Sequence, residues 1–349
     1  MNNNDILTAI ENKLTGNFEE DVKFILKEAD HFRKLEAFDL VNEIMKILEK
    51  HYGDEAKKYL VEKAKENLKK RQEMYKEVIN LEKNKEFLKA QEIIVKLIDT
   101  FPTKRPIGPE VKLVSFNNLF EHLYYSINYQ KQDKIYRLEE PYANYYFHLG
   151  YILYHLNDYE GAIDSLTTAI NYNLVFVDAI LLRGECYLKL GQTDKFLTAV
   201  DEALENAYNK FQLANAYYLL AGYYTDIQNK ELAQACCHLS RNFVQTKELD
   251  NIYRRTTELP GPDLNTQDVE GFKKIFDDSR IQFGPNVKVL KTIVKLLNDQ
   301  KTKENPVVEY YFTTLMAELT NDPQFKKRLE ELAPVIDDLK KQSEKNKSN

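Results

Sequence analysis

The side chains best placed to do chemistry are two histidines within a polar and aromatic stripe. Asn144, His148, Tyr151 and His155 follow one another in steps of four, three and four residues, so a helix would present all four on one face. Two histidines seven residues apart lie about 10 Å apart along a helix axis. That separation is too long for both to bind one metal ion, so the stripe argues against a metal site.

The rest of the chain holds no recognisable catalytic motif. GxGxxG, GxxxxGK[ST], GxSxG and HExxH are all missing from the sequence. Cys186, Cys236 and Cys237 are spaced neither as zinc ligands nor as a disulfide framework, and each falls in a helical pattern typical of a small buried hydrophobe. We therefore expect no enzymatic activity, no cofactor and no metal.

Composition and charge exclude several other classes of protein. The 349 residues include only 11 glycines and 10 prolines, which argues against an all-β or Pro/Gly-rich chain. With 49 basic and 55 acidic residues the net charge is −6, which argues against binding mainly nucleic acid or anionic lipid. The basic run Lys69-Lys70-Arg71 is surrounded by glutamates and indicates a solvated helix face.

The N-terminus lacks the basic and apolar regions of a secretory signal, and no apolar run reaches the length of about 18 residues that a membrane span needs. We expect a cytoplasmic protein without membrane insertion.

Proline positions predict the domain boundaries. Proline costs about 3 kcal/mol inside a helix, and none occurs from Met1 to Phe101 or from Tyr142 to Leu259. Later prolines such as Pro285, Pro306, Pro323 and Pro334 indicate shorter helices, several with proline in the first turn, as at Pro285 and Pro306. The predicted parts are an N-terminal helical block over 1–103, a helical connector over 104–142, a repeat array over 143–259, and a C-terminal helical block over 260–349 that frays from Lys340.

The middle of the chain repeats with a period of 34 residues. Shifting the sequence by that length sets Leu149–Asn157 over Arg183–Gly191, glycine on glycine and apolar on apolar. A further slip of three residues brings in Leu220–Ile227. A period of this size indicates a two-helix unit that must stack on its neighbours to bury its apolar face.

The three copies resemble the tetratricopeptide repeat family. Residues at the family's characteristic large and small positions are Tyr146, Leu149, Gly150, Leu153, Ala162, Leu166 and Ala169 in the first copy, Ile180, Gly184, Tyr187 and Ala203 in the second, and Tyr217, Leu220, Ala221, Tyr224 and Ala233 in the third. The second copy departs from the pattern at Arg183 and Phe196. The resemblance implies an all-α, right-handed α-solenoid with helical extensions at both ends.

Weaker helical patterns flank the array. Degenerate copies are predicted around 29–48 and 78–102, and a long charged helix over Asp54–Asn84. The spacing of its apolar residues Val61, Ala64, Leu68, Tyr75 and Val78 fits either a homodimer seam or an intramolecular packing face. A helix is expected within 110–142, and four more after residue 266, of which the last, Phe325–Leu332, could cap the solenoid.

The resemblance also implies a concave groove lined by the first helix of each repeat. The residues that map to the groove are Asn144, Phe147, His148, Tyr151, Tyr154 and His155 in the first repeat, Leu181, Leu182, Glu185, Leu188 and Lys189 in the second, and Tyr218 and Leu219 in the third. Such an aromatic and aliphatic wall suits an amphipathic helix or an extended peptide. With Lys189 as its one lysine or arginine, the wall does not fit the family's clamp for a C-terminal carboxylate.

The sequence leaves open whether the groove is free or filled by the chain's own helices. We expect a non-catalytic scaffold or adaptor that binds a protein or peptide in the groove, with no nucleic-acid partner. The alternatives are a peptide-responsive regulatory sensor and, less favoured, an enzyme carried on helical repeats, which would need convergent ionisable residues.

Overall fold

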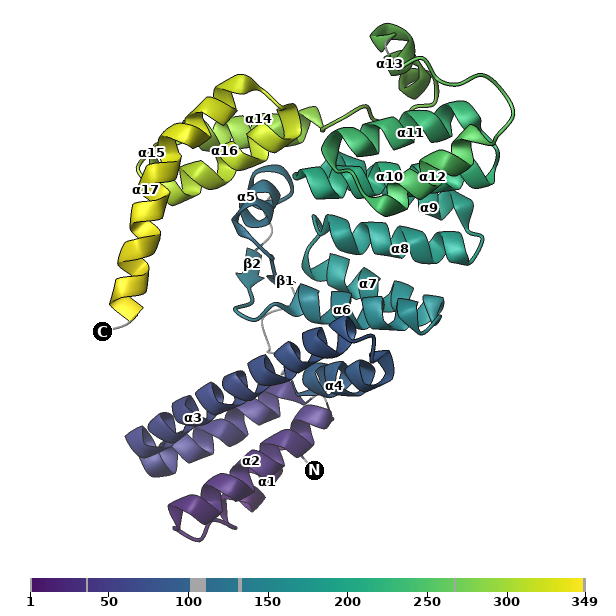
Figure 1. Ribbon diagram of the computed structural model, residues 1–349. Coiled ribbons are helices and arrows are strands. Elements are labelled where there is room, and N and C mark those ends of the chain that lie inside the picture. The colour runs from purple at the N-terminus through teal and green to yellow at the C-terminus, as the bar shows by residue number, and fades with distance from the viewer. Residues whose placement is uncertain (1, 36, 101–110, 131–133, 267, 348–349) are drawn as a thin grey trace. The chain divides into compact units, whose positions relative to one another are not determined.

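Most of the described residues are helical, as the scarcity of glycine and proline predicts. The computed structural model describes residues 2–35, 37–100, 111–130, 134–266 and 268–347 (Figure 1). The prolines at 102, 106 and 109 and the basic pair Lys104-Arg105 lie outside these residues. The chain forms two compact units, unit 1 from 1–114 and 132–138, and unit 2 from 115–131 and 139–349.

Unit 1 is built around one long helical segment, α3. Its elements are α1 (Asn3–Glu11), α2 (Phe18–Lys34), α3 (Phe38–Lys83), α4 (Phe87–Asp99), β1 (Val111–Val114) and β2 (Lys134–Arg137). The backbone of α3 leaves helical geometry at Gly53, where φ is 51°, so the predicted charged helix from Asp54 forms the second part of α3. The first part of α3 and α2 share a core of aliphatic residues that includes Ile25 and Ile44.

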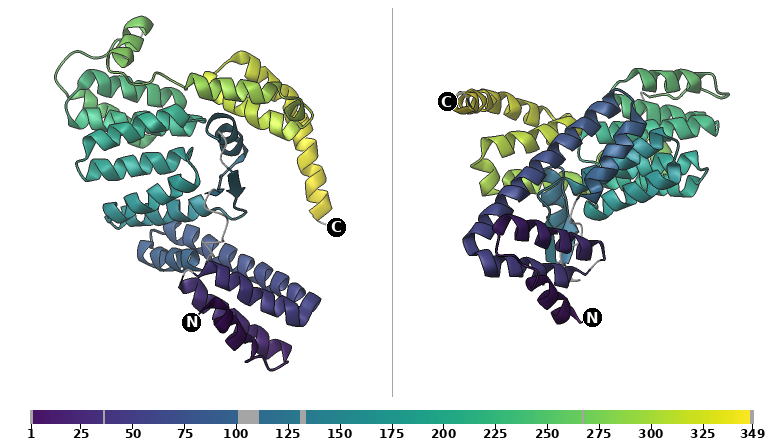
Figure 2. Two further views of the ribbon diagram at one scale, coloured as in Figure 1. Left: turned by 180° about the vertical axis from the view of Figure 1, so that it is seen from behind. Right: turned by 90° about the horizontal axis from the view of Figure 1, so that it is seen from below.

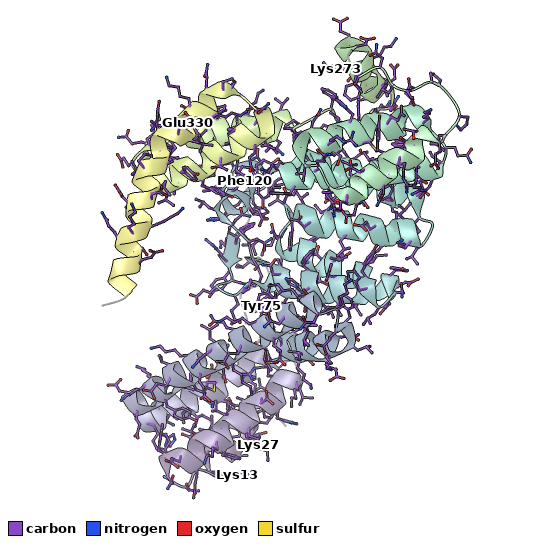
Figure 3. The ribbon with its side chains drawn as sticks, viewed as in Figure 1. Lys13, Lys27, Tyr75, Phe120, Lys273 and Glu330 are labelled. Atoms are coloured by element: carbon purple, nitrogen blue, oxygen red, sulfur yellow. The ribbon has the colours of Figure 1, made fainter. Side chains whose placement is uncertain are left out.

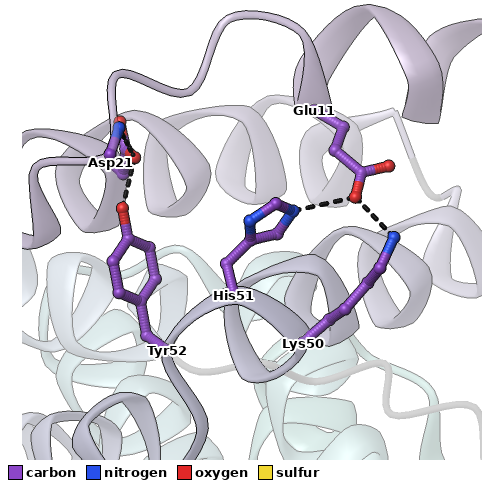
Figure 4. A network of polar contacts seen from close by, with 6 residues as sticks. Glu11, Asp21, Lys50, His51 and Tyr52 are labelled. Carbon is purple, nitrogen blue, oxygen red and sulfur yellow. Dashed lines mark hydrogen bonds and ion pairs between the residues drawn. The ribbon is translucent and has the colours of Figure 1, made fainter.

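Polar contacts through Asp21 of α2 tie the loop after α1 to the end of the first part of α3 (Figure 4). The buried Asp21 carboxylate accepts hydrogen bonds from the Thr15 N–H at 2.7 Å, the Gly16 N–H at 2.9 Å and the Tyr52 hydroxyl. These bonds lower the pKa of Asp21 despite its burial.

The predicted connector contains two strands that sequence patterns did not indicate. β1 and β2 pair in parallel, with Val111 opposite Lys134 and Val114 opposite Arg137. Strands of four residues are too short to show a clear alternation of polar and apolar residues, so the sequence pattern did not predict them. The helix expected in the same region is present as α5 (Leu119–Asn128).

Unit 2 confirms the three predicted helix pairs. They are α6 (Tyr142–His155) with α7 (Tyr159–Tyr172), α8 (Val177–Lys189) with α9 (Thr193–Asn206), and α10 (Lys210–Asp226) with α11 (Lys230–Phe243), and Figure 2 shows them stacked in order. Glycine allows close helix contact, because a Cβ on Gly150 would come within 2.6 Å of Leu166 and one on Gly184 within 3.2 Å of Ala199.

The turn inside each pair repeats as well. Asn157, Gly191 and Gln228 all have φ between 61° and 70° and each follows the first helix of its pair. The N–H of the next residue then bonds back to the carbonyl of the residue five positions earlier, which closes the helix in a Schellman motif. Lys85, between α3 and α4, has the same geometry, with φ of 60°. The upstream degenerate copy therefore shares the turn of the clear repeats.

The remaining helices differ in part from the sequence-based expectations. They are α12 (Lys247–Thr257), α13 (Val269–Asp278), α14 (Val287–Asn298), α15 (Gln300–Lys303), α16 (Pro306–Thr320) and α17 (Pro323–Lys347). The segment predicted to cap the solenoid lies in α17, which packs on α16. That prediction was wrong, because α12 instead covers α10 and α11.

The prolines of the C-terminal region are also only partly as predicted. Pro306 and Pro323 begin helices, but Pro285 precedes the N-cap residue Asn286 and so lies outside the first turn of α14. Pro334 lies inside α17, which continues past Lys340 to Lys347. The residues after Pro334 are mostly good helix formers, which accounts for the continuation.

The helix α5 is held against the repeats by a buried carboxylate. The Phe120 ring (Figure 3) packs against the Tyr208 ring at a tilt, with ring centroids 4.7 Å apart. Glu121 accepts hydrogen bonds from Asn173 Nδ2 at 2.8 Å and from the Tyr208 hydroxyl at 3.0 Å. Burial raises the pKa of Glu121 to about 6, although these bonds and one from the Asn117 N–H oppose the shift.

Candidate peptide-binding surface

The predicted groove residues lie on three neighbouring helices. Contacts of α8 with both α6 and α10 place the first helices of the repeats side by side. We call the side of α6, α8 and α10 that carries the predicted residues the first-helix face. It belongs wholly to unit 2.

The predicted residues fall into three groups by exposure. Half-buried are Asn144, Phe147, His148, Tyr151, Tyr154, Glu185, Leu188 and Tyr218. His155 and Lys189 are exposed. Leu181, Leu182 and Leu219 are buried and belong to the main hydrophobic core. The accessible part of the face is therefore aromatic with a few polar groups, and the three leucines support it from beneath.

Glu185 lies at the centre of the accessible part. Its carboxylate accepts a hydrogen bond from the Tyr154 hydroxyl at 3.1 Å, which links α6 to α8. Burial raises the pKa of Glu185, and the Tyr154 hydrogen bond and the charge of Lys189 oppose that shift. The pKa of Tyr218 on α10 is raised by burial and by the charges of Glu185 and Glu248. Three successive first helices thus direct side chains toward a negatively charged region.

The two histidines pack against aromatic rings. His155 makes edge contacts with Tyr151 and Tyr154, with ring centroids 4.5 and 5.4 Å apart, and His148 makes one with Phe147 at 5.4 Å. Within the described residues, no group of three or more histidine, cysteine, aspartate or glutamate side chains could hold a metal ion. The histidines therefore contribute aromatic surface to the face.

The helix α5 contacts the repeats outside the predicted residues. Its partners Asn173 and Tyr208 lie in the connections after α7 and α9, and its partner Asn206 is the last residue of α9. Lys210 at the start of α10 forms an ion pair with Glu318 of α16 at 2.7 Å. These contacts attach α5 and the C-terminal helices to the ends of the repeat helices, while Tyr154, Leu188 and Tyr218 keep accessible surface.

A pocket of about 250 Å³ opens at the third repeat. It is lined by Phe211, Ala214, Asn215 and Tyr218 of α10, Ser240 of α11, and Val244, Thr246 and Glu248 around the start of α12. Sequence reasoning found Tyr218 but missed Phe211, which precedes it by seven residues on the same helix face. The α12 side was missed because that helix lies beyond the last recognised repeat.

The cysteines are buried and free. Burial raises the pKa of Cys186 and of Cys237 to about 12, and that of Cys236 rises as well. Thiols in this state are poor nucleophiles. The expectation that they act as small hydrophobic residues is confirmed by their place in the main core.

The fold and the face define a helical-repeat protein, in which stacked helix pairs present a continuous surface. Comparison with family models matches residues 143–174 to the tetratricopeptide repeat. Residues 143–174, which span α6 and α7, thus form a tetratricopeptide repeat, as the resemblance of the first helix pair indicated. The repeat supports a general role in protein–protein interaction.

A search of curated proteins found no match to this chain. In the part of the chain that the structure describes, no helix combines the length and the apolar character needed to cross a membrane.

Proposed function

We propose that this protein is a non-catalytic scaffold or adaptor that binds a peptide or helix of a protein partner along the first-helix face. The observation that carries the proposal is the row of accessible aromatic and aliphatic side chains on α6, α8 and α10, supported by a rigid leucine core. Such a surface gains affinity from a few large anchors at little ordering cost. The free buried thiols fit a cytoplasmic protein.

The proposal is tested by removing two anchors from the same helix. Replacing Tyr151 and Tyr154 by alanine truncates two half-buried rings, so we expect the double variant to lose captured partners in affinity purification from the native cytosol. The matched control is Ile227→Ala, which truncates a 53% exposed side chain after α10. Circular dichroism should show that both variants remain folded. Capture of the same partners in the same amounts by the double variant would contradict the proposal.

We further propose a homodimer through the second part of α3. The supporting observation is that Val61, at 53% exposure, and Ala64 both face solvent on the predicted apolar stripe. Exposed apolar patches are a feature of protein interaction surfaces. Sedimentation equilibrium should show a dimer that dissociates in Val61→Lys, and a monomeric parent protein would refute the seam.

A further inference from the structure

The pocket on α10 has the size of a site for a single large side chain. Its volume of about 250 Å³ falls below the range of roughly 300–1,000 Å³ typical of small-molecule sites. Phe211 forms one wall and is 61% exposed, which is unusual for so large an apolar ring in a folded chain. The pocket therefore offers apolar contact to a protruding side chain rather than an enclosure for a cofactor.

Two of the polar groups that line the pocket are already satisfied within the protein. The Ser240 hydroxyl donates to the Ala214 carbonyl at 2.8 Å, and the Thr246 hydroxyl accepts from the Leu249 N–H at 3.1 Å. Among the described residues, the Asn215 side chain and the Glu248 carboxylate have no such partner. These two groups remain available to a ligand.

The charge at the pocket is negative. Glu248 is the one ionisable carboxylate among the lining residues and is exposed. The neighbouring cation Lys210 lies over the Phe211 ring at 5.2 Å but is paired with Glu318 at 2.7 Å, so its charge is offset. Glu185 adds negative charge on the α8 side of Tyr218. A ligand that reaches this pocket meets an apolar wall with the Glu248 carboxylate in its lining, and the charge of Glu185 acts at Tyr218.

We propose that the pocket binds a peptide segment in which a large apolar residue stands beside lysine or arginine. The apolar side chain occupies the space between Phe211, Ala214 and Val244, and the basic residue faces Glu248. Asn215, whose amide both donates and accepts, contacts the peptide backbone. This inference rests on the proposed function and specifies the chemistry of the partner.

The test is selection from a phage-displayed library of random dodecapeptides on the full-length protein, followed by fluorescence anisotropy with synthetic copies of the selected peptides. We expect an enriched pattern of Leu, Ile, Met or Phe next to Lys or Arg. Phe211→Ala should weaken binding about tenfold, because it removes an anchor wall. Glu248→Lys should weaken it about threefold to tenfold at low salt and less at high salt, because the pair is exposed.

Matched variants separate these effects from general damage. Ile227→Ala removes an exposed apolar side chain outside the pocket, and Glu231→Lys reverses an exposed charge in the first turn of α11, as Glu248→Lys does in α12. Both controls should bind the peptides as the parent protein does. Equal weakening by a control and its partner variant would overturn the inference.

Two further outcomes distinguish this inference from the proposed function. Selected peptides without basic residues, or peptides weakened by Tyr154→Ala and Leu188→Ala but not by Phe211→Ala and Glu248→Lys, would overturn the inference and leave the face as the binding surface. Peptides whose binding none of the four variants weakens, or a library that yields no binder, would overturn both.

Discussion

Each unit of this protein contains a buried carboxylate that holds helices together without a cationic partner among the described residues. Asp21 in unit 1 and Glu121 in unit 2 are both 1% exposed. Both accept hydrogen bonds from neutral donors. Their pKa values nevertheless move in opposite directions, down for Asp21 and up to about 6 for Glu121.

The difference follows from depth and from the kind of donor. Burial raises the pKa of both groups, but Asp21 lies beside the small core of unit 1 and receives two adjacent backbone N–H groups and two hydroxyls. Glu121 lies on the buried side of α5 next to the Phe120 ring, and the charge of Asp178 adds to the upward shift of its pKa. Hydrogen-bond donors thus lower the pKa of a carboxyl group more than burial raises it near the small core of unit 1. Within the larger core of unit 2, the effect of burial on the pKa is the stronger one.

The largest expected effect comes from neutralising Asp21. Asp21→Asn loses the charge and turns an amide N–H₂ toward donors, so we expect unit 1 to lose about 3 kcal/mol of unfolding free energy at neutral pH. Urea unfolding combined with hydrogen exchange of α2 measures the loss. The control Asp30→Asn breaks only exposed pairs with Arg33 and Lys34 and should change stability by less than about 0.5 kcal/mol. An equally small loss of stability in Asp21→Asn would contradict a stabilising role of the Asp21 carboxylate in unit 1.

The pH dependence of the two units should have opposite signs. The pKa of Glu121 is raised from 4.5 to about 6, so the folded state holds the proton more tightly and stability falls as pH rises across that interval. The shift corresponds to about 2 kcal/mol. The lowered pKa of Asp21 gives unit 1 stability that is present above the unfolded value of 3.8 and is lost as pH falls through the folded value.

Other carboxyl groups of unit 2, such as Glu185 and Asp178, also have raised pKa values. Comparing the parent protein with Glu121→Gln isolates the contribution of Glu121. Denaturant unfolding of both proteins at several pH values from about 4 to 7 should give a difference that changes by about 2 kcal/mol. Parallel pH profiles for the two proteins would show that Glu121 titrates normally.

The smallest expected effect is that of Gly150→Ala on the stability of unit 2, and it tests whether the two units unfold independently. In Gly150→Ala the new Cβ meets Leu166 at 2.6 Å, and overpacking minus the gain in helix propensity should cost unit 2 about 1 kcal/mol. Gly222→Ala meets only Ile252 at 3.7 Å and should be neutral or stabilising. Hydrogen exchange in α2 should be unchanged by either variant, and a shift there would reveal coupling between the units.

Sequence reasoning was most accurate for features that depend on neighbouring residues in the chain. The repeat spacing predicted the three helix pairs and placed Gly150 and Gly184 at characteristic small positions, where the structure has close helix contacts. It failed where packing between distant segments decides the outcome. The cap on the last pair is α12 rather than the predicted segment in α17, because covering α10 and α11 depends on where the chain returns.

The candidate site divides in the same way. The sequence by itself determined which residues share the first-helix face, since helical spacing is a local property of the chain. Tertiary structure alone decided that Leu181, Leu182 and Leu219 support the face from beneath. It also brought Phe211 and Glu248 to one pocket, because α12 folds back over α10 across a distance in sequence that no repeat pattern encodes. Burial and proximity depend on the whole fold, and they set the charge and shape that a partner would meet.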